Sequence, residues 1–374
     1  MKKYFLLACA LGAFGVADAA TVQFSSPDKK LVVTVADDGG RPVYRVDYGE
    51  TTFLAPSPLG LLTNIGDFSQ GMALQESSFA VSPVSGHYEL PTIKRSKVDV
   101  QATKAVCPFY KDGKHIFDVV FHVSDHDVAF KYKVYPQGNT LCCVVKEETT
   151  GFVLPQGTTT FLCPQSGPMG GFARTSPSYE TGYTVDNEMG KNGWGHGYTF
   201  PCLFRTGDKG WVLISETGVD SRYCASRLMG KDGGLYTIGF PQEGEYNGNG
   251  TTSPGISLPG ETPWRTITVG QTLAPIVETT IPYDVVEPLY EPSRQYVYGR
   301  GTWSWIIAGD NSMNYEDQKR YVDFAADMGY ESVLVDAWWD SRVGHERIAE
   351  LARYAAAKGV GLYLWYNSNG YWND

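Results

Sequence analysis

The sequence predicts a two-part fold: a large antiparallel β-sandwich over residues 21–280, and a parallel βα region over residues 298–374. In the first part, short apolar or alternating runs are separated by turn residues, which is typical of antiparallel strands. In the second part, apolar strands alternate with amphipathic helices, which indicates a parallel sheet with right-handed crossovers. Residues 281–297, which contain Pro282, Pro288 and Pro292, are expected to form the linker.

Residues 1–20 are expected to form a signal peptide. Lys2 and Lys3 precede the apolar stretch Tyr4–Val16, and Ala17–Ala19 matches an A-x-A cleavage signal. The apolar stretch is shorter than the roughly 18 residues that a membrane helix needs, and no other segment approaches that length. We therefore expect export to the periplasm or the extracellular space, with no membrane span.

The composition excludes one class of partner. A net charge of −10 without a cluster of lysine and arginine argues against nucleic acid, and the hydrophobic fraction of 42% is that of a soluble globular protein. Cys9 lies in the signal peptide, and the other six cysteines are interpreted as buried or bridged rather than catalytic. Adjacent Cys142 and Cys143 point to opposite faces of one strand and do not easily share a metal site.

The expected strands of the sandwich follow one another from Thr21 to about Thr280. His115–Val123 and Val128–Tyr135 are expected to pair as a hairpin across Ser124–Asp127. The strands are expected at Val22–Phe24, Leu31–Val35, Val43–Tyr48, His115–Val123, Val128–Tyr135, Leu141–Val145, Thr159–Cys163, Trp211–Ser215, Leu235–Phe240 and Trp264–Val269.

The segment Arg174–Arg205 differs from its surroundings, because it has few aliphatic residues and many tyrosines, glycines and carboxylates. A long polar and aromatic loop on a rigid sandwich is a usual place for function, although a solvated surface loop is the alternative. Its carboxylate and amide oxygens suit a hard cation such as Ca²⁺. His196 either binds substrate or caps a turn. The candidate cation ligands are Glu180, Asp186, Asn187 and Glu188.

The βα region is expected to begin with a strand at Tyr298–Ile307. A helix then follows from the N-cap Asn314, three residues before Asp317, to the stop at Gly329, and a second helix spans about Gly344–Lys358. Two further strands are expected at Ser332–Asp340 and Val360–Tyr366. The apolar positions expected to face the core are Tyr321, Phe324, Ala325 and Met328 in the first helix, and Ile348, Leu351, Ala355 and Ala356 in the second.

Parallel sheets bind ligands at the carboxyl ends of their strands. Rings beside carboxylates and amides suit a sugar, which has apolar C–H faces and hydroxyl edges. For Trp303 and Trp305 alone a core position is favoured, and a single aspartate can simply cap a helix. The group Asp336, Trp338, Trp339 and Asp340 favours a site. The candidate substrate-binding residues are Trp303, Asp336, Trp338, Asn367 and His196.

Several segments resemble glycoside hydrolase family 97 over essentially the whole mature chain: SSPDKKLVVTV, TPWRTITVGQTLAPIVETTI, GRGTWSWI, MGYESVLVDAWWD and GVGLYLWYNSNGYWND. The resemblance implies an exported bacterial enzyme with an N-terminal β-supersandwich and a (β/α)₈ barrel. It implies hydrolysis of α-galactosides or α-glucosides by two carboxylates, with an active-site calcium ion bound by Glu180. Asp336 would hold sugar hydroxyl groups, with Trp303 or Trp338 against the ring. The WSW and VDAWWD wording is more similar to the retaining α-galactosidase branch.

The chain departs from the family pattern because a complete barrel needs about 250 residues. The stretch from Tyr298 to Asp374 holds only the first three βα units, so the nucleophile and the acid/base are expected beyond Asp374, with no catalytic residue within this chain. The expectation is an inactive fragment of an enzyme that is monomeric when complete and binds an oligosaccharide. The alternative is a non-catalytic, exported carbohydrate-binding β-sandwich, which would have no need to begin a parallel barrel.

Overall fold

The computed structural model describes residues 19–166, 177–178, 181–245, 251–294 and 296–366. The fold divides into two compact units, and the main division falls between Glu287 and Pro288. We call them the β unit (19–166 and 181–287, without 246–250) and the βα unit (288–366, without 295), and each is described by itself.

The β unit is built from strands that form one large antiparallel sheet and one small sheet. The strands of the large sheet are β1 (Thr21–Ser25), β2 (Leu31–Ala36), β3 (Val43–Tyr48), β4 (Thr51–Pro58), β7 (Ala73–Leu74), β8 (Ala80–Glu89), β9 (Lys97–Lys111), β10 (Lys114–Val123), β11 (Asp127–Val134), β13 (Gly151–Val153), β14 (Thr158–Pro164), β15 (Asn187–Glu188), β16 (Tyr198–Thr206), β17 (Trp211–Thr217), β18 (Arg227–Gly230), β19 (Leu235–Gly239), β21 (Gly260–Glu261) and β22 (Trp264–Gly270). The small sheet contains β5 (Leu61–Thr63), β6 (Gly66–Asp67), β12 (Cys142–Glu148) and β20 (Gly255–Ser257).

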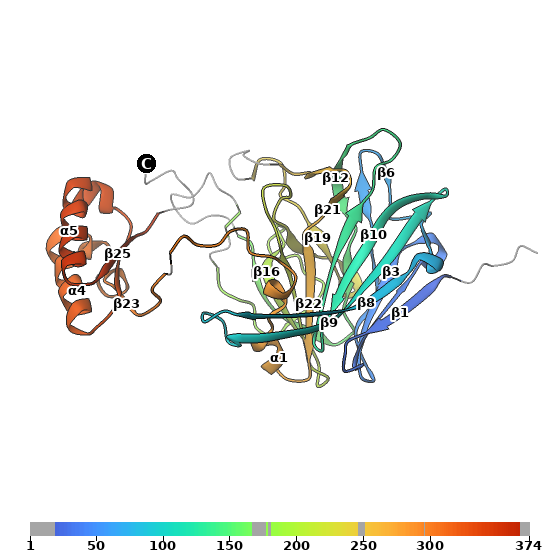
Figure 1. The fold of residues 1–374 in the computed structure, drawn as a ribbon, viewed down its shortest axis with the longest axis horizontal. Helices are drawn as coiled ribbons and strands as arrows, with labels where there is room; N and C mark the ends of the chain where they lie inside the picture. Colours follow the sequence, from blue (N-terminus) through green and yellow to red (C-terminus); the bar gives the residue numbers. More distant parts are fainter. Residues whose placement is uncertain (1–18, 167–176, 179–180, 246–250, 295, 367–374) are drawn as a thin grey trace, which may run out of the picture. The chain divides into compact units, whose positions relative to one another are not determined.

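The pairing follows a path that the sequence order does not suggest (Figure 1). From one edge it runs β1, β2, β3, β4, β13, β19, β18 and β16, and continues through β17, β22, β11, β10 and β9 to β8. Strand β22 pairs with β17 along Trp211–Thr217 and with β11 along Asp127–Phe130. The C-terminal strand of the sheet therefore joins its two halves.

Alternating side chains make this long sheet close around one core. In β2 the residues Leu31, Val33 and Val35 are fully buried, whereas the residues between them are half-buried. Phe24 of β1 packs on Phe121 of β10, with ring centroids 5.1 Å apart, so two strands distant along the pairing path face each other. This face-to-face packing confirms the expected sandwich.

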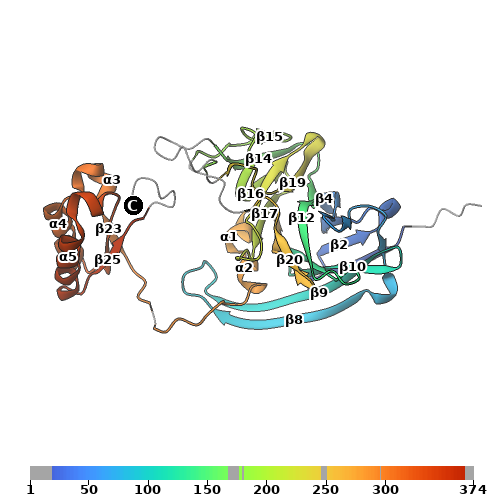
Figure 2. The ribbon, with the colours of Figure 1, turned by 90° about the horizontal axis from the view of Figure 1, so that it is seen from above.

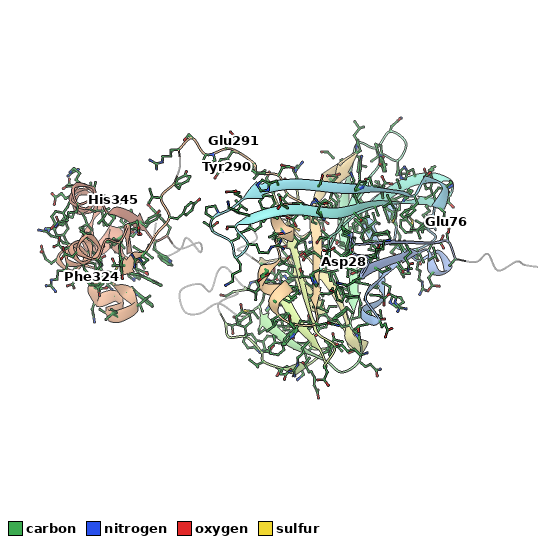
Figure 3. The ribbon with its side chains drawn as sticks, turned by 60° about the horizontal axis from the view of Figure 1, so that its bottom comes forward. Asp28, Glu76, Tyr290, Glu291, Phe324 and His345 are labelled. Carbon is green, nitrogen blue, oxygen red and sulfur yellow. The ribbon has the colours of Figure 1, made fainter. Side chains whose placement is uncertain are left out.

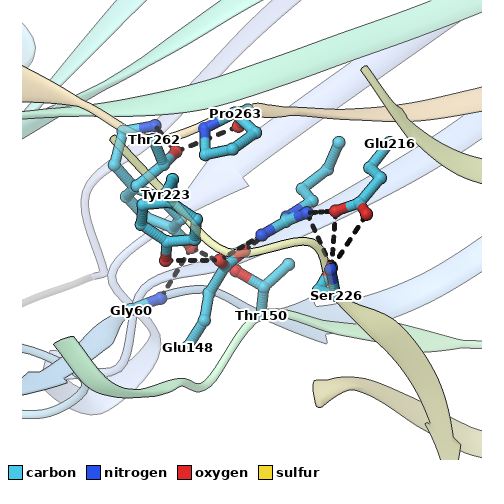
Figure 4. Close-up of polar contacts among 10 residues, drawn as sticks. Gly60, Glu148, Thr150, Glu216, Tyr223, Ser226, Thr262 and Pro263 are labelled. Carbon is cyan, nitrogen blue, oxygen red and sulfur yellow. Dashed lines mark hydrogen bonds and ion pairs between the residues drawn. The ribbon is translucent and has the colours of Figure 1, made fainter. Parts of the chain in front are cut away.

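A buried ionic network crosses the core of the β unit (Figure 4). Arg265 of β22 donates from Nε and Nη2 to the two carboxylate oxygens of Glu148 of β12, at 2.8 and 2.6 Å. Its Nη1 donates to Glu216 of β17 at 2.5 Å and to Ser226 at 3.0 Å. Tyr223 adds a hydroxyl donor to Glu148 at 3.3 Å. The Arg265 and Glu148 side chains are almost entirely inaccessible to solvent, so the network ties the small sheet to the large one.

Most of the predicted β segments are confirmed, including the hairpin of β10 and β11, whose register runs from Phe117↔Val134 to Val123↔Val128. Several strands lie where none was expected, among them β4, β18 and the pair β8 and β9. Figure 2 shows β8 and β9 as a long hairpin in a stretch where no strand was expected. The expected loop Arg174–Arg205 was wrong in its last part, since Tyr198–Thr206 is the strand β16, paired with β14 and β17.

After β22 come two short helices, α1 (Ala274–Glu278) and α2 (Ile281–Asp284). The carboxylate of Asp127 on β11 accepts hydrogen bonds from Thr268 of β22 and from Thr279 between these helices, at 2.5 and 2.6 Å. Asp284 in turn accepts from the Tyr88 hydroxyl at 2.6 Å. These bonds attach the helical segment to the outside of the sheet.

The βα unit contains a parallel sheet in the order β23 (Gly301–Trp303), β24 (Ser332–Val335) and β25 (Gly361–Leu364). The connections are α3 (Trp305–Ala308) and α4 (Tyr315–Asp327) before β24, then a π-helical turn at Trp339–Val343 and α5 (His345–Ala357) before β25. Asn314 caps α4 by accepting from the Asp317 amide at 2.9 Å, as predicted, and Gly329 follows the helix with φ +65°.

Four details of this unit were predicted incorrectly. The strand expected at Tyr298–Ile307 is limited to Gly301–Trp303, because the chain turns into α3 at Trp305, and the strand expected at Ser332–Asp340 ends at Val335. In α4 the core positions are Gln318, Val322 and Ala325, whereas Phe324 and Met328 are half-exposed. Figure 3 places Phe324 on α4 and His345 at the start of α5. In α5 the expected core positions hold except for Ala356, which is exposed.

Among the described residues, free thiols are found at Cys107, Cys142, Cys143, Cys202 and Cys224, and because Cys142 is exposed, the interpretation as buried or bridged was wrong for that residue. Cys107, Cys143 and Cys202 are buried, and burial raises the pKa of the Cys143 thiol to about 11, which keeps it protonated and inert. In the part of the chain that the structure describes, no helix is both long and apolar enough to cross a bilayer.

Candidate functional site

The carboxyl edge of the parallel sheet brings two of the predicted residues into direct contact. Trp303 is the last residue of β23, and Asp336 directly follows β24. The parallel register pairs Trp303 with Leu334, which places the two strand ends side by side. The indole Nε1 of Trp303 donates to Oδ2 of Asp336 at 2.6 Å. The sequence predicts both residues and their common edge, and the structure adds the hydrogen bond.

Asp336 is a buried carboxylate with capacity for further hydrogen bonds. It is 5% exposed, and its Oδ1 accepts from the Ala337 amide at 2.6 Å. Each carboxylate oxygen can accept two hydrogen bonds, so Asp336 retains free lone pairs after these two contacts. Such a group can accept hydrogen bonds from the hydroxyl groups of a ligand, and a charged acceptor makes these bonds strong.

Trp303 and Trp305 form a stacked pair above this edge. Their ring centroids lie 6.1 Å apart and their planes are inclined by 18°. They are 37% and 41% exposed, so neither takes the core position that was favoured for them. The Trp305 Nε1 donates to Asp310 at 3.0 Å. Two partly exposed, parallel indoles beside a carboxylate offer a flat apolar surface next to a hydrogen-bond acceptor.

The neighbouring tryptophans Trp338 and Trp339 have different roles. Trp339 is 7% exposed, and its Nε1 donates to the Trp365 carbonyl at 3.0 Å, which links the ends of β24 and β25. Trp338 is half-buried and adopts a left-handed backbone conformation, with φ +67° and ψ +11°. This conformation is unfavourable for a bulky residue, and such strain is often found at functional sites.

Arg342 connects Trp338 to the segment that follows α3. Its guanidinium lies 5.8 Å from the centre of the Trp338 ring, and Nη1 donates to the Asp310 carbonyl at 2.6 Å. Asp340 accepts from the amide of the next residue, Ser341, at 2.8 Å within the π-helical turn, and it caps neither that turn nor α5. Trp305 was expected in the core, so its contribution to this edge was not predicted, and Asp310 and Arg342 were not found from the sequence. The W-x-W spacing was a signal for Trp305, whereas nothing local marks the other two.

The remaining predicted site residues lie elsewhere. Glu180 and Asn367 are outside the described residues. His196 lies in the β unit, where its carbonyl accepts from Arg227 at 3.1 Å and its Nδ1 is 3.9 Å from Glu245.

Three of the four candidate cation ligands, Asp186, Asn187 and Glu188, are among the described residues. Asp186 is ion-paired with Arg205 and accepts from Thr159, both at 2.5 Å, and Asn187 and Glu188 form β15. Over the described ranges, no three His, Cys, Asp or Glu side chains are grouped so that they could hold a metal ion.

Comparisons with known proteins bear on the β unit first. The family model described as "Glycosyl-hydrolase 97 N-terminal" matches residues 24–288. A probable retaining alpha-galactosidase of Streptomyces bingchenggensis is 31% identical over 355 residues, which is 91% of this chain and 51% of that protein. A retaining alpha-galactosidase of Bacteroides thetaiotaomicron is 23% identical, with 100% of this chain and 60% of that protein covered. The chain thus spans between half and two thirds of these curated relatives.

Solved structures extend the similarity through both units. The crystal structure of a beta-arabinopyranosidase superposes with a TM-score of 0.88 at 53% identity, covering 94% of this chain and 56% of that one. A glycoside hydrolase family 97 enzyme from Pseudoalteromonas sp. strain K8, in complex with panose, gives a TM-score of 0.72 at 21% identity and covers 91% of this chain and 53% of its own. The second similarity is one of fold alone.

Proposed function

Since the chain belongs to glycoside hydrolase family 97, we propose that it acts in the hydrolysis of a pyranoside whose hydroxyl groups have the arrangement found in galactose. The observation that carries this proposal is the contact between Trp303 and Asp336 at the carboxyl edge of the parallel sheet. In this proposal the βα unit belongs to a (β/α)₈ barrel, whose active site lies at that edge.

The binding roles follow from the geometry. Asp336 accepts hydrogen bonds from sugar hydroxyl groups on its free lone pairs, and Trp303 holds its carboxylate in place through Nε1. The stacked indoles of Trp303 and Trp305 offer an apolar surface to the C–H face of the ring. Trp338, which is two residues after Asp336 and lies beside Arg342, offers a further ring to the sugar. These residues bind and orient the sugar, while hydrolysis in this class of enzyme needs two further carboxylates that flank the glycosidic bond.

The choice of substrate is supported by the names of the relatives. Two relatives are named alpha-galactosidases, and the relative at 53% identity is named a beta-arabinopyranosidase. β-L-Arabinopyranose and α-D-galactopyranose share the configuration of all their common ring hydroxyl groups and differ by the hydroxymethyl group of galactose. One set of hydroxyl contacts therefore serves both sugars, and the space around that hydroxymethyl group decides between them. An α-glucoside, the other substrate expected from the sequence, differs at the 4-hydroxyl.

Calcium and export belong to the proposal as well. Glu180 would contribute to a calcium site, although the described residues supply no ligand set for one, and no step of the reaction is assigned to the ion. Export would be accompanied by cleavage after Ala19 or Ala20, and N-terminal sequencing of the exported protein is the test. The parallel βα unit favours an enzyme over a carbohydrate-binding module, which has no need of such a unit.

Binding measured on this chain tests the proposal directly. Methyl α-D-galactopyranoside, methyl β-L-arabinopyranoside and methyl α-D-glucopyranoside are titrated against it by calorimetry, and the first two are expected to bind. Asp336→Asn removes the charge from the acceptor and is expected to weaken binding by about tenfold or more. Asp340→Asn, at a half-buried aspartate that accepts from the Ser341 amide, is the matched control.

Because Asp336 is buried, Trp305→Ala provides a second variant whose side chain is partly exposed and less important for folding. It is expected to weaken the same sugars severalfold, with an unchanged melting temperature. Wild-type affinity in both variants, for each of the sugars, would refute the assignment of this edge as the sugar site.

A further inference from the structure

The loop Lys191–Gly197 (KNGWGHG) of the β unit holds an exposed tryptophan on a tightly defined backbone. Trp194 is 63% exposed, whereas Tyr198, the first residue of β16, is buried. Gly193 and Gly195 on either side have no side chains that could cover the indole. Both faces of a large apolar ring are thus left open by its immediate neighbours.

The glycines are required by the conformation of the loop. Gly193, Gly195 and Gly197 have φ values of +55°, +93° and +82°, a region that side chains disfavour. A Cβ atom at Gly193 would lie 3.0 Å from Pro164, and one at Gly197 would lie 2.6 Å from the Met229 sulfur and 2.7 Å from the Leu228 carbonyl. The loop therefore lies against β14 and β18 at a distance that only glycine allows.

Hydrogen bonds fix the loop at both ends. The Asn192 side chain accepts from the Gly230 amide at 3.0 Å, and its carbonyl accepts from the Gly195 amide at 3.0 Å. The Gly197 carbonyl accepts from the Gln165 amide at 2.9 Å. An exposed loop with this many anchors loses little conformational freedom when a ligand binds, which favours affinity.

A buried ion pair contacts the backbone of the loop. Arg227 and Glu245, which are 2% and 8% exposed, form a bidentate pair, and Arg227 Nη1 also donates to the His196 carbonyl at 3.1 Å. A third of the His196 side chain is exposed, and its Nδ1 is buried without a hydrogen-bond partner. The imidazole can therefore contact a ligand only through its other edge. His196 is two residues from Trp194 in the sequence.

We propose that this loop is a carbohydrate-binding site of the β unit, with a pyranose ring stacked on Trp194 and a hydroxyl group bonded to His196. Open indole faces with glycine and polar neighbours suit a sugar, whose ring has apolar faces and a hydroxyl periphery, better than an apolar protein surface. The inference rests on the proposed function, because a glycoside supplies the ligand. Neither residue belongs to the edge formed by Trp303 and Asp336.

The test measures binding of raffinose and methyl α-D-galactopyranoside to the full chain by saturation-transfer NMR and calorimetry. Trp194→Ala is expected to weaken raffinose binding by about tenfold, and Trp194→Phe by less, because a smaller ring still stacks. His196→Ala is expected to weaken it severalfold. The matched control is Tyr183→Ala, at another aromatic residue of the β unit that is 71% exposed. It is expected to bind like the wild type.

The outcomes separate this inference from the proposed function. Wild-type raffinose affinity in Trp194→Ala and His196→Ala, together with weaker binding in Asp336→Asn, would overturn the loop site and leave the proposed function in place. Sugar binding that survives in Asp336→Asn and is lost when Trp194→Ala is added would support the loop site, even if the site at Trp303 and Asp336 does not bind the sugar. No binding of either probe to the wild type would count against both.

Discussion

Arg265 is the residue whose replacement should test the energetics of the β unit most sharply. We expect Arg265→Met to lower the free energy of unfolding by about 3–5 kcal/mol, because it leaves buried carboxylates without their counter-charge. Methionine is shorter than arginine but similar in volume, so the change mainly removes the charge and the donors.

The structure assigns most of this loss to Glu148. Without Arg265, Glu216 keeps its bonds to the amide and hydroxyl of Ser226, at 2.9 and 2.6 Å, and is partly exposed. Glu148 keeps only the Tyr223 hydroxyl at 3.3 Å and remains inaccessible to solvent. Replacing Glu148 by leucine in the Arg265→Met background removes the orphaned charge and should recover most of the lost stability, since an apolar pair can replace a buried ion pair.

Urea unfolding of the wild type, the single variants and the double variant gives the measurement, followed by far-UV circular dichroism. With an m-value of about 3 kcal/mol/M, the Arg265→Met midpoint should fall by roughly 1–1.7 M. A loss below about 1 kcal/mol would refute the reasoning, because it would mean that water or rearrangement compensates Glu148. A double variant no more stable than Arg265→Met would do the same, since the penalty would then not arise from the orphaned carboxylate.

Three further predictions concern single residues. Asn314→Ala should destabilise α4 by about 1 kcal/mol through loss of the N-cap, seen as faster hydrogen exchange of its first amides, and equal rates would contradict the cap. Burial raises the pKa of the Asp127 carboxyl above its ordinary value of 3.8. The free energy of unfolding of the wild type minus that of Asp127→Asn should therefore fall as the pH rises from 3.8 through the raised pKa. A rise in this difference would contradict the prediction. Calcium should raise the melting temperature of the wild type and of Glu188→Gln but not of Glu180→Gln, and an equal rise in all three would exclude Glu180.

The sequence predicts those parts of the fold that depend on local patterns. The hairpin of β10 and β11 follows from apolar runs on both sides of a polar turn, and the α4 cap follows from Asn314 and Asp317. Strand β16 was missed because its Tyr, Thr, Phe and Pro residues follow a glycine-rich stretch and resemble a continuation of the loop.

The candidate site could be predicted only to the level of its edge. The parallel strands place Trp303 and Asp336 at the same side of the sheet, but the hydrogen bond between them depends on the register of two strands whose ends are 33 residues apart in the sequence. The different burial of Trp338 and Trp339 follows from a left-handed backbone turn that no neighbouring glycine indicates. The partners of Arg265 are 117 and 49 residues away, so no sequence window contains them.

The position of β22 in the sheet has a consequence for how the chain folds as it is synthesised. Because β22 lies between β11 and β17, both of these strands have an unpaired edge until residues 264–270 are available. Most of the β unit is therefore made before its two halves can be joined, and folding cannot be completed strand by strand from the N-terminus. Such a topology has a high contact order and is expected to fold slowly. A nascent chain released before Gly270 would expose two strand edges suited to pairing with other chains, whereas one that includes it would close them.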